Sequence, residues 1–285
     1  MKISKLIDQL YWISKFGKPI RKVSSEELFA SPHIIEDPIF FLSTGRCGTE
    51  WFSHVISKKK NAIVFHNPTP NFSIQNKFIY ELIQQGVDQS LVHQVSTQVY
   101  FTGREQHLRY AYKTDKRFIE TNNHITFFAH ALAKLFPSAR FVHLYRHPGD
   151  FVTSGMNRGW FDHNKAATEK IIVPKDLSAW SDYSRVQKIG WVWNETNLFI
   201  EDFKNQHPER TFSYDFTRRE FPALKELCKS LQLDFHDQKL KHWLNTKRNV
   251  QKEKHFPSHK NWNVADKEAL KAICGELSKK YQYVL

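Results

Sequence analysis

The chain has 285 residues, 40% hydrophobic and 14% aromatic, which is enough for the core of one large domain or two small ones. Its formal net charge of +13 at pH 7 predicts attraction to anions such as nucleotide phosphates, an acidic polymer or an anionic membrane surface. Because it has neither a long apolar run nor a signal-peptide pattern, we expect a soluble, cytoplasmic protein and exclude a membrane-spanning one.

Cysteine and histidine usage argues against a disulfide framework and against a metal site. The 3 cysteines lie far apart and are odd in number, as expected for reduced thiols. The 15 histidines show no Cys/His ligand spacing, so we expect no bound metal. Zinc-finger spacing, an RNA-binding signature and heptads are also missing, and we therefore expect no nucleic-acid partner.

The N-terminal residues 1–37 are predicted to form a helical extension of a single domain that spans residues 1–285. Apolar residues recur at helical spacing from Ile3 to Ile13 and lysines lie around them, which predicts a basic amphipathic helix. Such a helix usually docks on its own domain, but residues 3–16 could also make peripheral contact with a membrane.

Short apolar runs farther along the chain predict strands, and longer segments with helical spacing alternate with them. This alternation predicts a three-layer α/β fold, in which helices flank a central, mainly parallel sheet. The predicted strands are the run after Pro38 and residues 62–65, 117–120, 139–145 and 211–216. The predicted helices start near Trp51, cover 74–114 and 125–136, run through Ser154, and cover 180–203, 220–232, 236–244 and 265–281. In the helix at 180–203, the residues expected to face inward are Trp191, Trp193, Leu198 and Phe199.

Polar and charged groups follow several of the predicted strands. They are the turn at 43–49, His66, the segment 120–124 and Arg146. In parallel sheets ligands bind beyond the carboxyl ends of the strands, so we expect an active site there. The turn leads into a helix whose first N–H groups lack internal partners, which predicts an anion site, and Arg46 adds a permanent cation.

Two of these segments together resemble the sulfotransferases that use 3′-phosphoadenosine 5′-phosphosulfate (PAPS). In that family the first strand ends in a loop with Lys or Arg before Ser-Gly-Thr and a large residue shortly after, which is similar to Arg46-Cys47-Gly48-Thr49-Glu50-Trp51. The family's second motif is a strand, an Arg and a Ser eight residues later, as in Arg146 and Ser154. Weaker similarity extends over residues 212–216 and 259–262.

The resemblance implies in-line transfer of a sulfuryl group from PAPS to a hydroxyl of a carbohydrate, glycolipid or small alcohol, without a metal. It implies that Arg46 stabilises charge on the bridging oxygen, while the amides of the turn and the Thr49 hydroxyl hold the phosphosulfate. Trp51 and Tyr214 would stack on adenine, and Arg146 with Ser154 would bind the 3′-phosphate. The implied PAPS-binding residues are Gly45, Arg46, Cys47, Gly48, Thr49, Glu50, Trp51, Arg146, Ser154, Tyr214 and Lys260.

Two positions depart from the family pattern. Cys47 replaces a small hydroxyl residue; its backbone N–H can still donate, but a thiolate at a helix N-terminus could instead be reactive. Glu50 stands where Thr is common, and we expect its side chain to turn away and favour the helix N-terminus.

Three residues are candidates for the general base, which must reach the acceptor hydroxyl. His66 at the end of the second strand is the first choice, slightly ahead of His124 and Glu120 after the third. Each could instead be a satisfied polar residue at a strand end.

Two other functions are compatible with a basic surface and an anion-binding turn. A phosphate-loop kinase would need Gly-x-x-x-x-Gly-Lys-Ser/Thr, and no Lys follows Gly48. A non-enzymatic protein that binds nucleic acid or an acidic glycan would need the basic surface but no nucleotide pocket.

Overall fold

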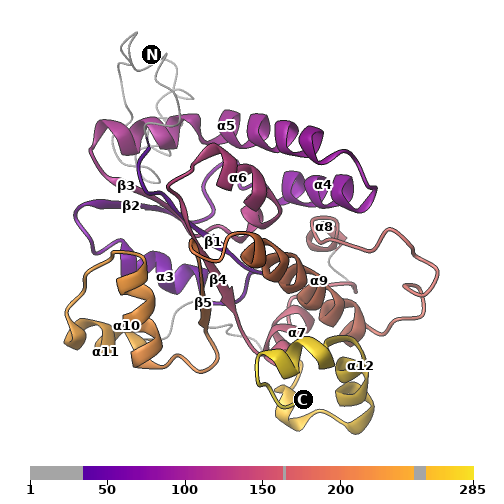
Figure 1. The fold of residues 1–285 in the computed structure, drawn as a ribbon. Coiled ribbons are helices and arrows are strands. Elements are labelled where there is room, and N and C mark those ends of the chain that lie inside the picture. Colours follow the sequence, from indigo (N-terminus) through magenta and orange to yellow (C-terminus); the bar gives the residue numbers. More distant parts are fainter. Residues whose placement is uncertain (1–34, 163–164, 247–254) are drawn as a thin grey trace, which may run out of the picture.

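A five-stranded parallel sheet forms the centre of the protein (Figure 1). The computed structural model describes residues 35–162, 165–246 and 255–285, so the amphipathic helix predicted at 3–16 lies outside the described residues. The strands are β1 (Ile39–Leu42), β2 (Ala62–Phe65), β3 (Arg117–Glu120), β4 (Arg140–Tyr145) and β5 (Thr211–Asp215), in the spatial order β2-β3-β1-β4-β5. The predicted α/β fold with a mainly parallel sheet is therefore confirmed.

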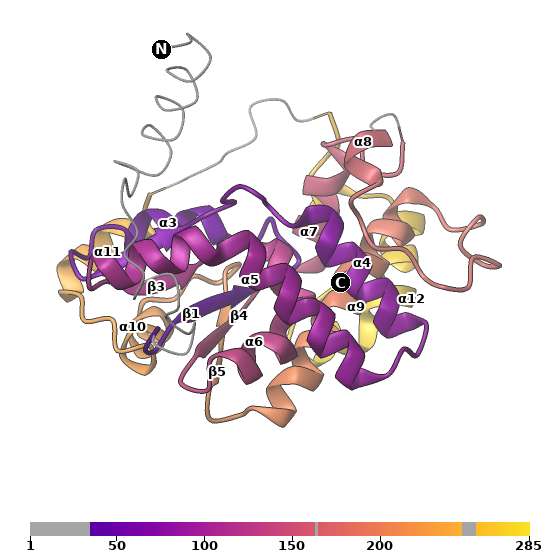
Figure 2. The same cartoon turned by 90° about the horizontal axis from the view of Figure 1, so that it is seen from above.

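Helices connect the strands and cover both faces of the sheet. They are α3 (Thr49–Ile56), α4 (Ser73–Gln84), α5 (Gln89–Lys113), η2 (Asn123–Phe128), α6 (Ala129–Leu135), α7 (Pro148–Met156), α8 (Lys165–Thr168), α9 (Arg185–Gln206), α10 (Phe221–Ser230), α11 (Asp237–Leu244), η3 (His259–Asn261) and α12 (Val264–Lys280). Figure 2 shows α4 and α5 along the same side of the molecule, and α12 lies against α9.

The strand β1 lies in the middle of the sheet and contributes side chains to the hydrophobic cores on both of its faces. It pairs with β3 on one side and β4 on the other, and all of its residues are buried. Because side chains alternate along a strand, Phe40 and Leu42 pack on one face of the sheet, and Ile39 and Phe41 on the other. The first face is covered by α4, α5, α6, α7, α9 and α12, and the second by α3, α10 and α11.

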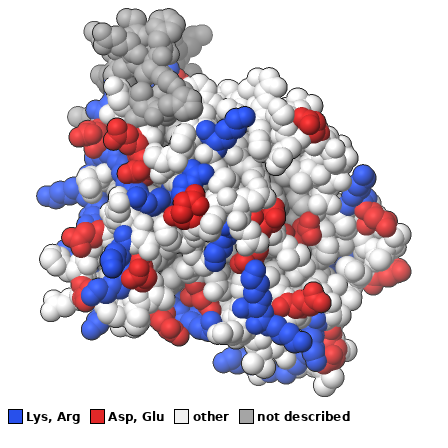
Figure 3. Space-filling model, viewed as in Figure 1, with Lys and Arg blue, Asp and Glu red and all other residues white. Residues whose placement is uncertain are grey.

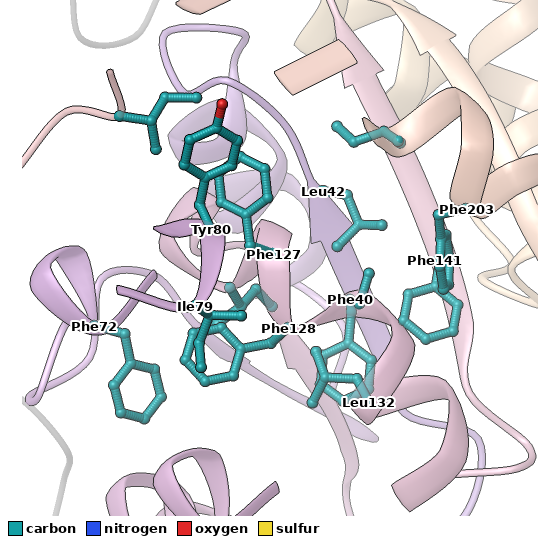
Figure 4. Close-up of a cluster of buried hydrophobic side chains, with 14 of the residues drawn as sticks. Phe40, Leu42, Phe72, Ile79, Tyr80, Phe127, Phe128, Leu132, Phe141 and Phe203 are labelled. Atoms are coloured by element: carbon teal, nitrogen blue, oxygen red, sulfur yellow. The ribbon is translucent and has the colours of Figure 1, made fainter. Parts of the chain in front are cut away.

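Aromatic side chains fill the larger of the two cores. Phe40 contacts Tyr100 at 6.1 Å and Phe136 at 5.5 Å between ring centroids. Figure 4 shows Phe40 near Phe141, with Phe127 and Tyr80 meeting at the other end of the same cluster. This end of the core reaches the carboxyl ends of the strands, where it supports η2.

Several predicted helix boundaries were wrong in detail. The segment 74–114 is two helices that end and restart around Gly86, and the segment 125–136 begins as the 3₁₀ helix η2. The helix predicted at 180–203 begins only at Arg185, because Ser184 and Gln187 form a capping box. Leu198, predicted to face inward, is 47% exposed.

Charged residues are spread over the surface. Lys and Arg lie among Asp and Glu on the face shown in Figure 3. Among the residues that the structure describes, no helix combines the length and the apolar character needed to cross a bilayer.

Candidate active site

The turn between β1 and α3 has a backbone suited to an anion. Gly45, Arg46 and Gly48 adopt positive φ angles of 77°, 56° and 92°. Gly48 is required here, because a Cβ atom on it would lie 2.2 Å from the ring of Phe216. Gly48 also precedes the first turn of α3 without any side-chain cap, so the turn's N–H groups face outward at the positive end of the helix.

Side chains hold this turn from behind. The Thr126 hydroxyl donates to the Ser43 carbonyl at 3.0 Å and accepts from the Ser43 N–H at 3.1 Å. The Cys47 thiol donates to the Gly45 carbonyl at 3.0 Å and is fully buried. Burial raises the pKa of Cys47 to about 11, so the thiol is protonated and faces away from the cavity. This argues against a reactive thiolate.

The structure brings the two sequence motifs together. The Arg46 Nε donates to the Ser154 Oγ at 3.2 Å, and the Arg146 Nη1 donates to the Arg46 carbonyl at 2.8 Å. Arg146 also pairs with Asp150 at 3.1 Å in the first turn of α7. Since β1 and β4 are neighbours, the turns that follow them meet at the same edge of the sheet.

Like charges gather at this junction. Burial, together with repulsion from Arg158 and Arg146, lowers the pKa of Arg46 to about 10. Arg46 and Arg146 both line the cavity, and their two guanidinium groups suit a ligand with several negative charges. Arg158 was not predicted; its position four residues after Ser154, about one helical turn, was the signal that could have indicated it.

The aromatic residues at the site differ from those predicted. Trp51 is 2% exposed, and its Nε1 donates to the Trp243 carbonyl at 3.1 Å. Tyr214 is also 2% exposed and packs edge-on against Phe52, away from the cavity. Trp51 still lines the cavity, and Phe216, just beyond β5, lines it as well, with its ring 6.0 Å from that of Trp51. Sequence reasoning included Phe216 only as part of a strand end.

His66 lies at the carboxyl end of β2 and lines the cavity. Its Nδ1 lies 3.1 Å from the hydroxyl of Thr121 and 3.3 Å from the carbonyl oxygen of the same residue, and the Asn67 Nδ2 lies 3.5 Å from Nε2. A proton on Nδ1 satisfies both contacts, because the carbonyl oxygen can only accept and the Asn67 amide nitrogen can only donate. Burial lowers the pKa of His66, which keeps the imidazole neutral at pH 7. A neutral imidazole whose Nε2 carries no proton can accept one.

His124 lies across the same cavity at the start of η2. Its backbone N–H donates to the Asn122 Oδ1 at 3.1 Å, which fixes the position of the residue. Burial lowers the pKa of His124 to about 4, and Lys170 and His66 add to this effect. His124 is therefore neutral as well, but it is a weaker base than His66.

Glu120 is not at the cavity. Its carboxylate is fully buried and forms an ion pair with Arg104 at 2.8 Å, and the Tyr100 hydroxyl donates to it at 2.9 Å. The Arg104 Nη1 in turn donates to the Pro70 carbonyl at 2.6 Å, in the loop that follows His66. The position at a strand end was predicted correctly, but the side chain points into the core.

In the segment 259–262, it is His259 rather than Lys260 that contacts residues beside the cavity. The His259 ring stacks on His147 at 4.3 Å and pairs with Asp150 at 3.2 Å. Lys260 is exposed and does not line the cavity. His147 accepts from the Gly149 N–H at 3.0 Å, so this pair of rings fixes the N-terminus of α7 beside Arg146.

One cavity of about 490 Å³ collects most of these groups at the carboxyl ends of the strands. This volume lies in the range of small-molecule sites. Among the described residues, no group of three potential ligands could hold a metal ion. The cavity is lined by the following residues of the predicted set: Gly45, Arg46, Gly48, Thr49, Glu50, Trp51, His66, His124 and Arg146.

Comparison with known proteins identifies the fold and the family. The chain is similar to the sulfotransferase STF9 from Mycobacterium avium, with 14% identity, a TM-score of 0.51, and coverage of 97% of this chain and 82% of that one. It also matches the sulfotransferase domain of the Synechococcus PCC 7002 olefin synthase, with 13% identity, a TM-score of 0.49 and coverage of 88% and 97%. No curated protein sequence matches it.

A profile of the sulfotransferase family matches residues 38–237, which is more than half of the chain. The chain therefore belongs to the sulfotransferase family. Membership supports a sulfuryl-transfer function and confirms the family resemblance seen in the sequence. The matched segment begins just before β1 and ends at the start of α11, so it contains all five strands.

Proposed function

We propose that this protein transfers a sulfuryl group from PAPS to a hydroxyl of an acceptor. The observation that carries the proposal is the meeting of Arg46 and Arg146 at one cavity, with Ser154 in contact with Arg46. The nucleotide supplies the sulfuryl group: the bond from sulfur to the bridging oxygen breaks, a bond from sulfur to the acceptor oxygen forms, and 3′-phosphoadenosine 5′-phosphate (PAP) leaves.

In this proposal the turn at residues 43–48 and the Thr49 hydroxyl bind the 5′-phosphosulfate. The turn's outward N–H groups and the N-terminus of α3 favour an anion. Arg46 stabilises the negative charge that grows on the bridging oxygen, and such preorganised donors lower a barrier by several kcal/mol. Arg146, Ser154 and Arg158 form the cationic group for the 3′-phosphate.

The adenine would lie against Phe216 and Trp51, which line the cavity together. Tyr214 and Lys260 have no direct role in the proposal, because neither lines the cavity.

The acceptor's proton passes to the Nε2 of His66 as the new bond forms. Its neutral state and fixed Nδ1 proton support this role. His124 is the second candidate, and Glu120 is no longer one because its carboxylate is enclosed by Arg104 and Tyr100.

Thermal stability in the presence of PAP tests the donor half of the proposal. A ligand at about one hundred times its Kd stabilises a protein by roughly 2.7 kcal/mol, so PAP should raise the melting temperature and ATP should raise it less. Arg146→Ala should abolish the shift. Arg140→Gln, at the opposite end of the same strand, is the matched control and should preserve it.

Three results are informative in this experiment. No shift with PAP would overturn PAPS as the donor. A larger shift with ATP would favour a phosphate-loop kinase, and a shift with polyanions alone would favour a non-enzymatic anion-binding protein.

A further inference from the structure

The cavity has a second wall that differs in composition from the nucleotide side. Apolar side chains from four separate segments line it: Phe127, Trp160, Ile171, Ile172 and Val192. They come from η2, the stretch after α7, the stretch after α8, and α9. None of the motifs identified in the sequence includes these residues.

This wall is held in place from outside the cavity. Arg185 at the start of α9 pairs with Asp162 at 2.9 Å and donates from its Nε to the Trp160 carbonyl at 3.1 Å. The Lys77 Nζ in α4 donates to the Glu169 carbonyl at 3.1 Å, and the Ile171 N–H donates to the Thr168 carbonyl at 2.9 Å. The apolar wall is therefore preformed.

Phe127 connects the wall to the core. Its ring packs against Tyr80 at 4.8 Å and Phe199 at 4.9 Å, and Figure 4 shows it beside Tyr80. The Phe127 N–H donates to the Asn76 Oδ1 at 3.0 Å, so its backbone is also fixed. Apolar atoms on this wall offer no hydrogen bonds to the hydroxyls of a bound sugar, which would lose their hydration there without replacement. Asn76, Thr126 and Thr196 line the same cavity, but the Asn76 Oδ1 already accepts from the Phe127 N–H and the Thr126 hydroxyl is already bonded to the Ser43 backbone.

A single lysine lies beside this wall. Lys170 lines the cavity, is exposed to solvent, and immediately precedes Ile171. Its ammonium group acts electrostatically on His124 across the cavity. A cation at the rim of an apolar surface suits an anionic group on an otherwise apolar molecule.

We propose that the acceptor is an amphipathic alcohol: a hydroxyl on an apolar body that also carries an anionic group such as a carboxylate. The body lies on the apolar wall, the anionic group pairs with Lys170, and the hydroxyl faces His66. This assignment rests on the proposed sulfuryl transfer, and it selects an apolar alcohol over a carbohydrate among the acceptors.

Binding of defined probes to the full chain tests the assignment without any turnover. Calorimetry compares 8-hydroxyoctanoate, its neutral counterpart 1-octanol, and glucose, each without nucleotide. We expect both eight-carbon compounds to bind more tightly than glucose. Lys170→Gln should weaken 8-hydroxyoctanoate about two- to fivefold, the effect of a solvent-exposed ion pair, and leave 1-octanol unchanged.

Lys175→Gln is the matched control, because Lys175 is an exposed lysine in the same segment that does not line the cavity. Ile171→Asn should weaken both eight-carbon probes. Tighter binding of glucose than of 1-octanol, or equal effects of the two lysine variants on 8-hydroxyoctanoate, would overturn the assignment.

Nucleotide binding is measured separately on the same preparations, by the melting temperature with PAP. A PAP shift without binding of the eight-carbon probes overturns the acceptor class and leaves the proposed function standing. Binding of the probes without a PAP shift supports the amphipathic site and overturns PAPS as the donor.

Where PAP does bind, the rate of sulfuryl transfer to 1-butanol, 1-hexanol and 1-octanol gives an independent readout. Burial of each added methylene group should raise kcat/KM by up to about fourfold. Rates that do not depend on chain length would contradict contact with the apolar wall.

Discussion

The Nε of Arg46 donates to the Oγ of Ser154 at 3.2 Å, although the two residues are 108 positions apart in the sequence. This contact joins the turn after β1 to the middle of α7. It places the guanidinium between the two motifs.

Arg46→Met removes the cation that we assign to the bridging oxygen. We expect kcat to fall about 10²- to 10³-fold, as for the loss of one donor to a developing charge. Steady-state kinetics with PAPS and an accepted alcohol measures the change. Ser154→Ala should have a smaller effect on kcat, since it removes the contact that orients Arg46 and a hydroxyl assigned to the 3′-phosphate but leaves the guanidinium in place. A normal kcat with a raised KM for PAPS would contradict the assigned role.

His66→Gln removes the proposed base. Turnover should fall about 10²- to 10⁴-fold while PAP affinity stays nearly constant. His242→Gln, on the exposed end of α11, is the control. His124→Gln is made in parallel, and near-normal rates in both His66 and His124 variants would refute both candidates.

The pH dependence of turnover gives a second test of His66. Its active form is neutral, and burial lowers its pKa below the ordinary value of 6.5. Activity limited by His66 should therefore stay constant as the pH falls from 8 to about 6.5, and decline only below that. A rate that increases toward acidic pH would mean that a protonated group is required instead.

Glu120→Gln tests the buried pair with Arg104. Both side chains are 0% exposed, so loss of the negative charge leaves an uncompensated cation in the core. The free energy of unfolding, measured with urea, should fall by about 3–5 kcal/mol. Glu209→Gln, in an exposed pair with Arg210, should cost less than about 1 kcal/mol.

The fall in turnover at acidic pH should be unchanged in the folded Glu120→Gln protein, because the Glu120 side chain does not line the cavity. Loss of that fall would restore Glu120 as a base. Equal losses in the free energy of unfolding for the Glu120 and Glu209 variants would show that the buried pair contributes no more to stability than the exposed pair.

The cysteines should be inert in the native protein. Cys47, Cys228 and Cys274 are all buried, and burial raises the pKa of Cys47 to about 11 and that of Cys228 to about 12. Mass spectrometry after iodoacetamide at pH 7.5 should show no modification until guanidinium chloride unfolds the chain. Rapid native modification of Cys47 would support the reactive-thiolate alternative.

The strands were the part of the fold that the sequence predicted best. Residues 62–65 and 117–120 form β2 and β3 with the predicted bounds, since turn residues flank both apolar runs. The start of α9 was missed although Ser184 and Gln187 carry a capping-box signal, because the aromatic residues before them suggested a longer helix.

The site was predictable at the level of motifs but not of side-chain direction. Arg46 and Arg146 follow neighbouring strands, so their meeting could be expected from a parallel sheet. The burial of Glu120 in β3 depends on its ion pair with Arg104 in α5. No local sequence pattern indicates this pair, because the two residues meet only when the chain folds. The apolar wall beside Lys170 has no motif, because its members come from separate segments.

The position of β1 in the sheet has a consequence for synthesis of the chain. Both strands that pair with β1 come much later in the sequence, at Arg117–Glu120 and Arg140–Tyr145. At roughly 5–20 residues per second, the ribosome needs on the order of 5–20 s to add the stretch from β1 to β4. During most of that interval β1 has no neighbouring strand, and β4 completes its pairing only after β3 has been added. If the turn after β1 binds nucleotide as we propose, the nascent protein should gain that affinity only after β4 has emerged.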